Sequence, residues 1–239
     1  MEYRFFIGDG TALHPDEDKM IDQGWNEWIT RGRNQGHASN QTRLGNQYPV
    51  VGYQSQADDV MVLCPDGYKY LSYKRKESCK WAIANAFDYM FCASVDVYAR
   101  PERLMTSDFR NYDYHGLFCG NTGWRGTKSY LPESYIFGGG YWMSAKAAKI
   151  IAESPVTYWC EDWWVGMALS RSIHARVITR GAVAAKQSKY CLPPNYPRPD
   201  NDLISVELSS GNYNNRKMYE IHSYFDRPTM LQQHCRGLA

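Results

Sequence analysis

The sequence predicts an α/β protein with a mostly parallel central sheet flanked by helices. Three short apolar runs with strand character lie at Arg4–Ile7, Asp59–Leu63 and Met90–Val95, and each ends in polar or turn-forming residues. Segments in which apolar residues recur at helical spacing separate these runs. Strands that alternate with helices are typical of a mostly parallel sheet. The 239 residues fit a single domain, residues 1–239.

The longest helical pattern covers Leu71–Phe87, where Tyr73, Glu77, Trp81 and Ala84 share one face and the basic residues lie elsewhere. Further helices are expected around Asp16–Ile29, at Ala145–Glu153 and at Trp163–Ile173, and a further strand is expected at Ala175–Ile178.

Composition limits the classes of function. The formal net charge of +2 argues against broad non-specific binding of nucleic acid but leaves room for a local basic patch. The seven cysteines contain no C-x-x-C pair, which indicates reduced thiols in a cytosolic protein rather than a zinc site or a disulfide framework. Aromatic residues reach 15%, and the faces of tyrosine and tryptophan suit sugar rings and bases.

The sequence predicts no membrane segment. No stretch approaches the ~18 apolar residues that a spanning helix needs. The first residues, Met1–Arg4, are a poor start for a signal peptide, and the apolar run that follows them is short. We therefore expect a soluble, cytoplasmic protein.

The third apolar run ends in a single carboxylate, Asp96, which is followed shortly by a turn signal at Arg100-Pro101. The carboxyl edge of a sheet is where α/β enzymes place a metal or a sugar nucleotide. Asp96 is therefore the first candidate for the binding site. The alternative is that Asp96 only caps the turn.

Three segments, taken in order and with their spacing, resemble the family 31 glycosyltransferases, which are the β1,3-galactosyltransferase and fringe-like enzymes. They are Phe87–Leu104, Tyr135–Ser144 (YIFGGGYWMS) and Glu161–Gly166 (EDWWVG). The resemblance implies a GT-A-like fold and an inverting glycosyltransferase that moves a sugar from a UDP-sugar to a glycan hydroxyl. Animal members carry an anchor and a stem, so their absence here points to a bacterial, phage or viral enzyme, in the host cytoplasm if viral.

In the first segment the family has three consecutive aspartates where this chain has Ser94, Val95 and Asp96. The last of them ligates the divalent ion that bridges the phosphates of the donor. The resemblance thus implies that Asp96 binds Mn²⁺ or Mg²⁺, that Ser94 reaches the ribose, and that His222 supplies a second ligand. For His222 a structural role on a strand remains the alternative.

The second segment contains the triplet Gly138, Gly139 and Gly140. In the family it lies beneath donor and acceptor, where backbone amides without side chains donate to ligand oxygens. Tight packing of a bend explains a glycine triplet equally well. Upstream, Asp66–Lys74 resembles another family motif, which implies that Lys74 faces the diphosphate; the alternative is a solvated lysine.

In the family, a carboxylate of the third segment is the general base that deprotonates the acceptor hydroxyl, so the resemblance implies the same role here. Asp162 is the first choice and Glu161 the alternate, whereas a structural explanation is an acidic pair favourable to a helix N-terminus. Trp163 and Trp164 are candidates for stacking on the acceptor, although at least one of them is expected in the core. Tyr196, on the proline-rich loop Cys191–Asp202, is a third candidate.

Two other functions compete with transfer to a glycan. One is a glycosyltransferase that acts on hydroxymethylated bases of phage DNA and binds phosphates through a basic patch. The patch would contain either Lys69, Lys74, Arg75, Lys76 and Lys80 or Arg198, Arg216 and Lys217. The other is a non-catalytic sugar-binding protein.

Overall fold

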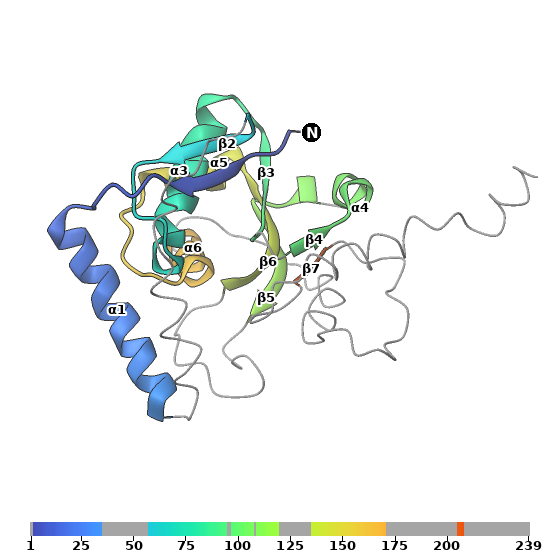
Figure 1. Ribbon diagram of the computed structural model, residues 1–239. Coiled ribbons are helices and arrows are strands. Elements are labelled where there is room, and N and C mark those ends of the chain that lie inside the picture. The colour runs from blue at the N-terminus through green and yellow to red at the C-terminus, as the bar shows by residue number, and fades with distance from the viewer. Residues whose placement is uncertain are drawn as a thin grey trace, which may run out of the picture.

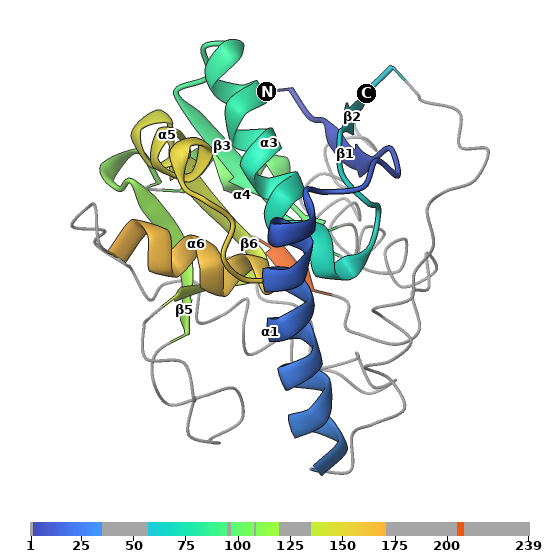
Figure 2. The same cartoon turned by 90° about the vertical axis from the view of Figure 1, so that its left-hand side faces the viewer.

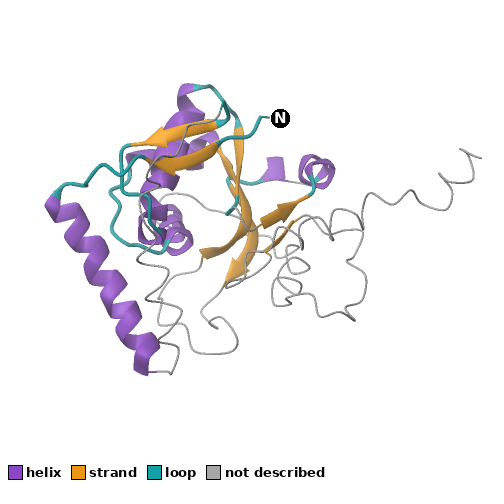
Figure 3. Cartoon of the chain, viewed as in Figure 1, coloured by secondary structure: helices purple, strands orange, loops and turns teal. Residues whose placement is uncertain are grey.

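The computed structural model describes residues 2–34, 57–94, 97–107, 109–119, 135–170 and 205–207. Within these ranges the chain forms both short strands and helices, which confirms a mixed α/β protein (Figures 1 and 3). The described strands form three small sheets with the orders β1-β2, β3-β6-β5 and β4-β7.

The first sheet pairs β1 (Phe5–Gly8) with β2 (Asp59–Val62) in parallel. Both strands lie within one residue of the predicted boundaries. Helix α1 (Pro15–Asn34) lies between them in the chain and begins with three acidic residues, which suit the positive end of the helix dipole. Phe6 of β1 packs on Trp81 of helix α3 (Leu71–Ala84). The two rings meet edge to face, with their centroids 5.9 Å apart.

The second sheet is antiparallel and contains β3 (Tyr89–Cys92), β6 (Tyr135–Ser144) and β5 (Tyr114–Cys119). Parallel pairing among the described strands is therefore confined to β1 and β2, whereas the sequence predicted a mostly parallel sheet. The difference arises because β5 and β6 were not predicted. The glycine triplet of β6 weakens the strand signal, since glycine is depleted in strands.

The third sheet pairs β4 (Val97–Ala99) with β7 (Ser205–Glu207) in antiparallel orientation. Helix α4 (Pro101–Thr106) follows β4 and starts at its proline. Proline suits the first helical position because its fixed φ is already helical and its missing N–H has no partner there. The expected turn at Arg100-Pro101 is thus the beginning of a short helix.

Helix α3 (Leu71–Ala84) lies at the centre of the described core and packs against α5 (Ala145–Glu153) and α6 (Glu161–Ser170) (Figure 2). Helix α5 has the predicted boundaries, because Ser144 caps it: the Oγ of Ser144 accepts from the N–H of Ala147 at 3.2 Å. Single turns of 3-10 helix precede α3 at Tyr68–Tyr70 and β5 at Phe109–Asn111.

Large side chains from β6, α5 and α6 fill the core between the helices and the antiparallel sheet. The most deeply buried of them include Ile136, Tyr141, Met143, Ile151 and Trp164. In the described ranges, no helix combines the length and the apolar character that crossing a bilayer requires.

Gly116→Ala tests the close approach of β5 to β6. A Cβ atom at Gly116 would lie 2.5 Å from Cγ2 of Ile136 and 2.9 Å from Cβ of Tyr141. Because both neighbours are buried, we expect a loss of roughly 1–3 kcal/mol in the free energy of unfolding, measured by urea denaturation. Gly24→Ala is the matched control. Its Cβ atom would meet only ring atoms of Tyr158 and Trp159 at 3.0–3.2 Å, and alanine has the higher helix propensity. Equal stability of the two variants would contradict this packing.

Candidate active site

The N-terminal part of α3 carries two adjacent cations, Lys74 and Arg75, and each is paired with a carboxylate. Lys74 donates to Oδ1 of Asp66, and both side chains are only 15% exposed. The same oxygen of Asp66 accepts from the backbone N–H of Gly8 at 3.1 Å. This contact joins the carboxyl ends of β1 and β2 to α3.

The approach of Gly8 to the residues after β2 leaves no room for a side chain. A Cβ atom at Gly8 would lie 2.6 Å from the carbonyl oxygen of Cys64 and 2.8 Å from Cα of Asp66. Because its side chain is only 15% exposed and pairs with Asp66, Lys74 is not the solvated lysine that the alternative supposed. It lies at the carboxyl edge of the parallel pair with its ammonium group already paired.

Arg75 pairs in another direction. Its Nε donates to Oε1 of Glu161 at 2.5 Å, and the hydroxyl of Tyr141 donates to the same oxygen. The Arg75 and Glu161 side chains are 15% and 11% exposed. The guanidinium carbon lies 5.3 Å from the centroid of the Tyr141 ring. These contacts tie together α3, β6 and the first turn of α6.

Burial and charge set the protonation states in this cluster. Burial disfavours a charged Arg75, but the surrounding acidic groups Cys92, Tyr141 and Glu161 outweigh it and raise the pKa of Arg75 above its ordinary value. Burial raises the pKa of Tyr141 well above its usual range. The Tyr141 hydroxyl therefore stays protonated and remains a donor to Glu161.

Helix α6 begins at Glu161, two residues before the predicted start, so both acidic residues lie in its first turn. That position favours negative charge, as the structural explanation of the pair supposed. Oδ1 of Asp162 accepts from the N–H of Trp163 at 3.1 Å and from Sγ of Cys160 at 2.9 Å. Burial raises the pKa of Cys160, and the negative charge of Asp162 raises it further, so this thiol stays protonated.

The end of the β3–β6 pair brings the predicted donor and catalytic segments to one place. Tyr141 is opposite Cys92 in this antiparallel pair. The glycine triplet at 138–140 precedes Tyr141 and therefore runs past the end of β3 toward Ser94, which is exposed. Tyr141 also binds Glu161, so the N-terminus of α6 lies at the same end. Gly140 has a φ of 125°, which other residues rarely adopt.

The two tryptophans after the acidic pair lie in different environments. Trp164 is 1% exposed, and its Nε1 donates to the carbonyl oxygen of Pro155 at 3.0 Å. An acceptor sugar has no access to that ring, so Trp164 is a core residue rather than an acceptor platform. Trp163 is half-buried and packs edge to face on Tyr158 with ring centroids 4.1 Å apart. The expectation that at least one of the pair lies in the core is confirmed.

Three predicted site residues, Asp96, Tyr196 and His222, lie outside the described residues. Within the described ranges, no group of three or more His, Cys, Asp or Glu side chains is arranged to hold a metal ion. The carboxylates of Asp66 and Glu161 are already neutralised by Lys74 and Arg75.

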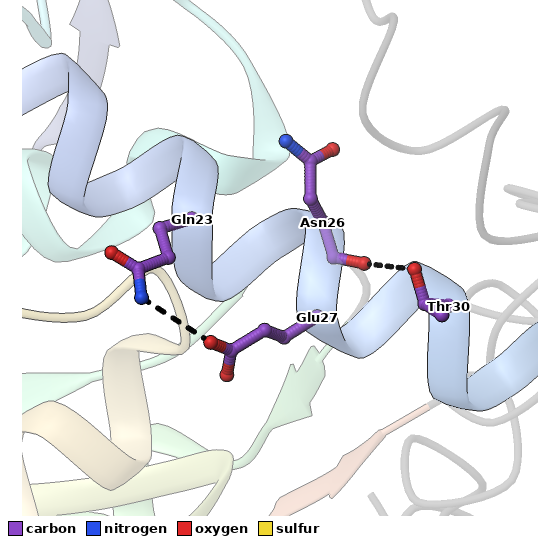
Figure 4. A pocket seen from close by; sticks show the side chains of 4 residues that line it. All are labelled: Gln23, Asn26, Glu27 and Thr30. Atoms are coloured by element: carbon purple, nitrogen blue, oxygen red, sulfur yellow. Dashed lines mark hydrogen bonds between the residues drawn. The ribbon is translucent and has the colours of Figure 1, made fainter.

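A pocket of about 510 Å³ lies elsewhere, on α1 (Figure 4). Its lining residues are Gln23, Asn26, Glu27 and Thr30. They bind mainly to one another: Nε2 of Gln23 donates to Glu27 at 3.4 Å, and Oγ1 of Thr30 donates to the carbonyl oxygen of Asn26 at 2.8 Å. No predicted site residue lines this pocket, so it does not mark the candidate active site.

Neither a protein-family model nor a curated protein matches this chain. The likeness to family 31 glycosyltransferases therefore depends on the short sequence segments alone.

Sequence reasoning assigned no role to Asp66 or Tyr141 and considered Arg75 only as part of a surface patch. The signal that could have found Asp66 and Tyr141 was their place inside the motifs that carry the family resemblance. The partner of Arg75 was not visible, because Glu161 is 86 residues away in the chain.

Cys92 leads to a prediction about alkaline stability. Burial raises the pKa of Cys92 from 9.0 to about 12. The unfolded thiol ionises first, so the folded state holds the extra proton and stability falls as the pH rises from about 9 to about 12. The contribution of Cys92 to this fall is at most ~1.4 kcal/mol per pH unit.

Urea denaturation of the wild type and of Cys92→Ala between about pH 8 and pH 10 measures this linkage. The alanine variant lacks the thiol, so the wild type should lose more stability over that interval. Parallel pH profiles for the two proteins would contradict the raised pKa.

Proposed function

We propose that this chain is an inverting glycosyltransferase that moves a sugar from a nucleotide-sugar, UDP-linked in the first instance, to a hydroxyl of a glycan. The observation that carries the proposal is the position of the acidic pair at α6. It lies at the same end of the β3–β6 pair as Ser94 and the glycine triplet. We propose further that the described strands belong to a sheet of the GT-A type.

The proposed donor site combines Ser94, Asp96, Lys74 and the glycine triplet Gly138, Gly139 and Gly140. Lys74 would have to exchange Asp66 for the diphosphate, since its ammonium is paired. Asp96 and His222 are the proposed ligands of Mn²⁺ or Mg²⁺, and the ion when bound would neutralise charge on the phosphates. Trp163 and Tyr196 remain the proposed acceptor platforms.

The transfer needs a base because an alcohol is a poor nucleophile at neutral pH. The oxygen of the acceptor hydroxyl attacks the anomeric carbon, and the bond from that carbon to the diphosphate breaks. The nucleoside diphosphate leaves with the bonding electron pair, and the hydroxyl proton passes to the carboxylate of Asp162. Asp162 is favoured over Glu161 because the carboxylate of Glu161 is already held by Arg75 and Tyr141.

The pairing of the lysines and arginine argues against DNA as the acceptor. Apart from Lys74, which is assigned to the donor diphosphate, three of the four remaining residues in the first candidate patch are already neutralised by carboxylates: Lys69 by Asp22, Arg75 by Glu161 and Lys80 by Glu77. Binding to DNA draws much of its affinity from lysine and arginine side chains that neutralise phosphates and displace the counterions condensed on the DNA. The other patch, Arg198, Arg216 and Lys217, lies outside the described residues.

The decisive experiment measures nucleotide release from a panel of UDP-sugars, with and without Mn²⁺ and with candidate glycan acceptors. Acceptor-dependent release of UDP from one donor supports the proposal. Saturable binding of a sugar without release of nucleotide from any donor would instead identify a non-catalytic sugar-binding protein. Affinity for an acceptor that falls steeply with salt would indicate DNA.

Asp162→Asn preserves shape and removes the proton acceptor. We expect turnover to fall by ~10²–10⁴-fold while donor affinity stays nearly unchanged. Single-turnover kinetics and calorimetry with UDP measure the two quantities separately. Asp16→Asn is the matched control, because Asp16 is also an acid in the first turn of a helix but its side chain is 89% exposed. Unchanged turnover in Asp162→Asn would remove this residue from the mechanism.

A further inference from the structure

We propose that Arg75, Tyr141 and Glu161 are positioning residues that fix the first turn of α6 and thereby orient Asp162. The inference rests on the proposed function, since it gives Asp162 a task. It assigns Glu161 to the support of the site rather than to proton transfer. Three elements far apart in the chain, α3, β6 and α6, meet at this one carboxylate.

Both partners of Glu161 are held firmly. Tyr141 is 1% exposed and lies in the central strand of the antiparallel sheet, between Cys92 and Gly116. Arg75 lies on α3, which also binds the segment that leads into α6: Oγ of the fully buried Ser72 donates to the carbonyl oxygen of Tyr158 at 2.8 Å. The start of α6 is therefore held from the strand side and from the helix side.

Fixing Glu161 also fixes its neighbour. Consecutive residues of an α-helix point about 100° apart, so a Glu161 side chain held against β6 sets the direction of Asp162. The contacts of Asp162 with Trp163 and Cys160 hold its Oδ1 within the same turn. A displacement of about 1 Å in a catalytic group can lower a rate ~10²-fold, so this anchoring bears directly on turnover.

The environment of Glu161 does not suit a base. Its side chain is 11% exposed, and its Oε1 already accepts from both a guanidinium and a phenol. Protonation would leave the buried charge of Arg75 without its counterion, which is strongly unfavourable. A carboxylate with that constraint holds its neighbours in place and does not exchange protons with an acceptor.

The first test does not depend on activity. Hydrogen exchange of the first-turn amides of α6, including the Trp164 N–H that donates to Cys160 at 2.9 Å, is measured in the full chain. Glu161→Gln and Tyr141→Phe should accelerate this exchange by roughly tenfold or more through local opening. Tyr141→Phe removes a single hydroxyl, so it tests the network even if Arg75 variants fail to fold. Glu77→Gln is the control, because its pair with Lys80 on α3 is exposed.

The second test separates positioning from proton transfer. In Glu161→Gln we expect turnover to fall roughly 10–100-fold, with donor KM unchanged and the acidic limb of the pH–rate profile retained. Asp162→Asn should lose that limb. A lost limb in Glu161→Gln would make Glu161 the base and overturn the inference.

A double variant, Arg75→Met with Glu161→Gln, separates positioning from simple stability. Arg75→Met alone leaves a buried carboxylate unpaired, whereas the double variant leaves neither charge, so its melting temperature should recover relative to Arg75→Met. Turnover should stay low because the double variant still lacks the Arg75–Glu161 contact that orients Asp162. Turnover that recovers together with stability would show a merely structural role and overturn the inference.

The two proposals can fail separately. Unchanged exchange in Glu161→Gln and Tyr141→Phe overturns the positioning inference whether or not the wild type transfers a sugar. Faster exchange in a protein that transfers no sugar overturns the proposed function and leaves the network as the support of the α6 terminus.

Discussion

The arrangement of the described elements depends on how two adjacent, half-buried cations of α3 are neutralised. Lys74 pairs with Asp66 after β2, and Arg75 pairs with Glu161 at the start of α6. An unpaired charge in these half-buried positions would be strongly unfavourable. Because neighbouring residues of a helix point in different directions, the helix can satisfy both only when the parallel pair and α6 lie on different sides of it.

The same pairing shapes the candidate active site. It holds one of the two acids in the EDWWVG segment and leaves Asp162 as the better candidate for chemistry. It also places the ammonium of Lys74 beside the ends of β1 and β2, where a phosphate would compete with Asp66. The support of the site and its proposed donor contacts thus originate from adjacent residues of one helix.

Elements marked by local signals could be predicted closely. Strands β1 and β2 begin and end within one residue of the apolar runs, and α5 has its predicted boundaries because Ser144 caps it. Strand β6 was missed because its glycine triplet resembles a turn or a bend rather than a strand. The first two residues of α6 were left out of the predicted helix because both are acidic and do not extend its apolar pattern.

The sequence by itself determined the class, the approximate places of the strands and helices that periodicity and turn residues mark, and the three segments that suggest a sugar transfer. These signals act over a few neighbouring residues. Only the tertiary structure decided that β6 lies between β3 and β5 and that Trp164 is buried while Trp163 is not. It alone decided that Arg75 holds Glu161 across 86 residues of chain, since burial and charge pairing depend on which surfaces meet when the chain folds.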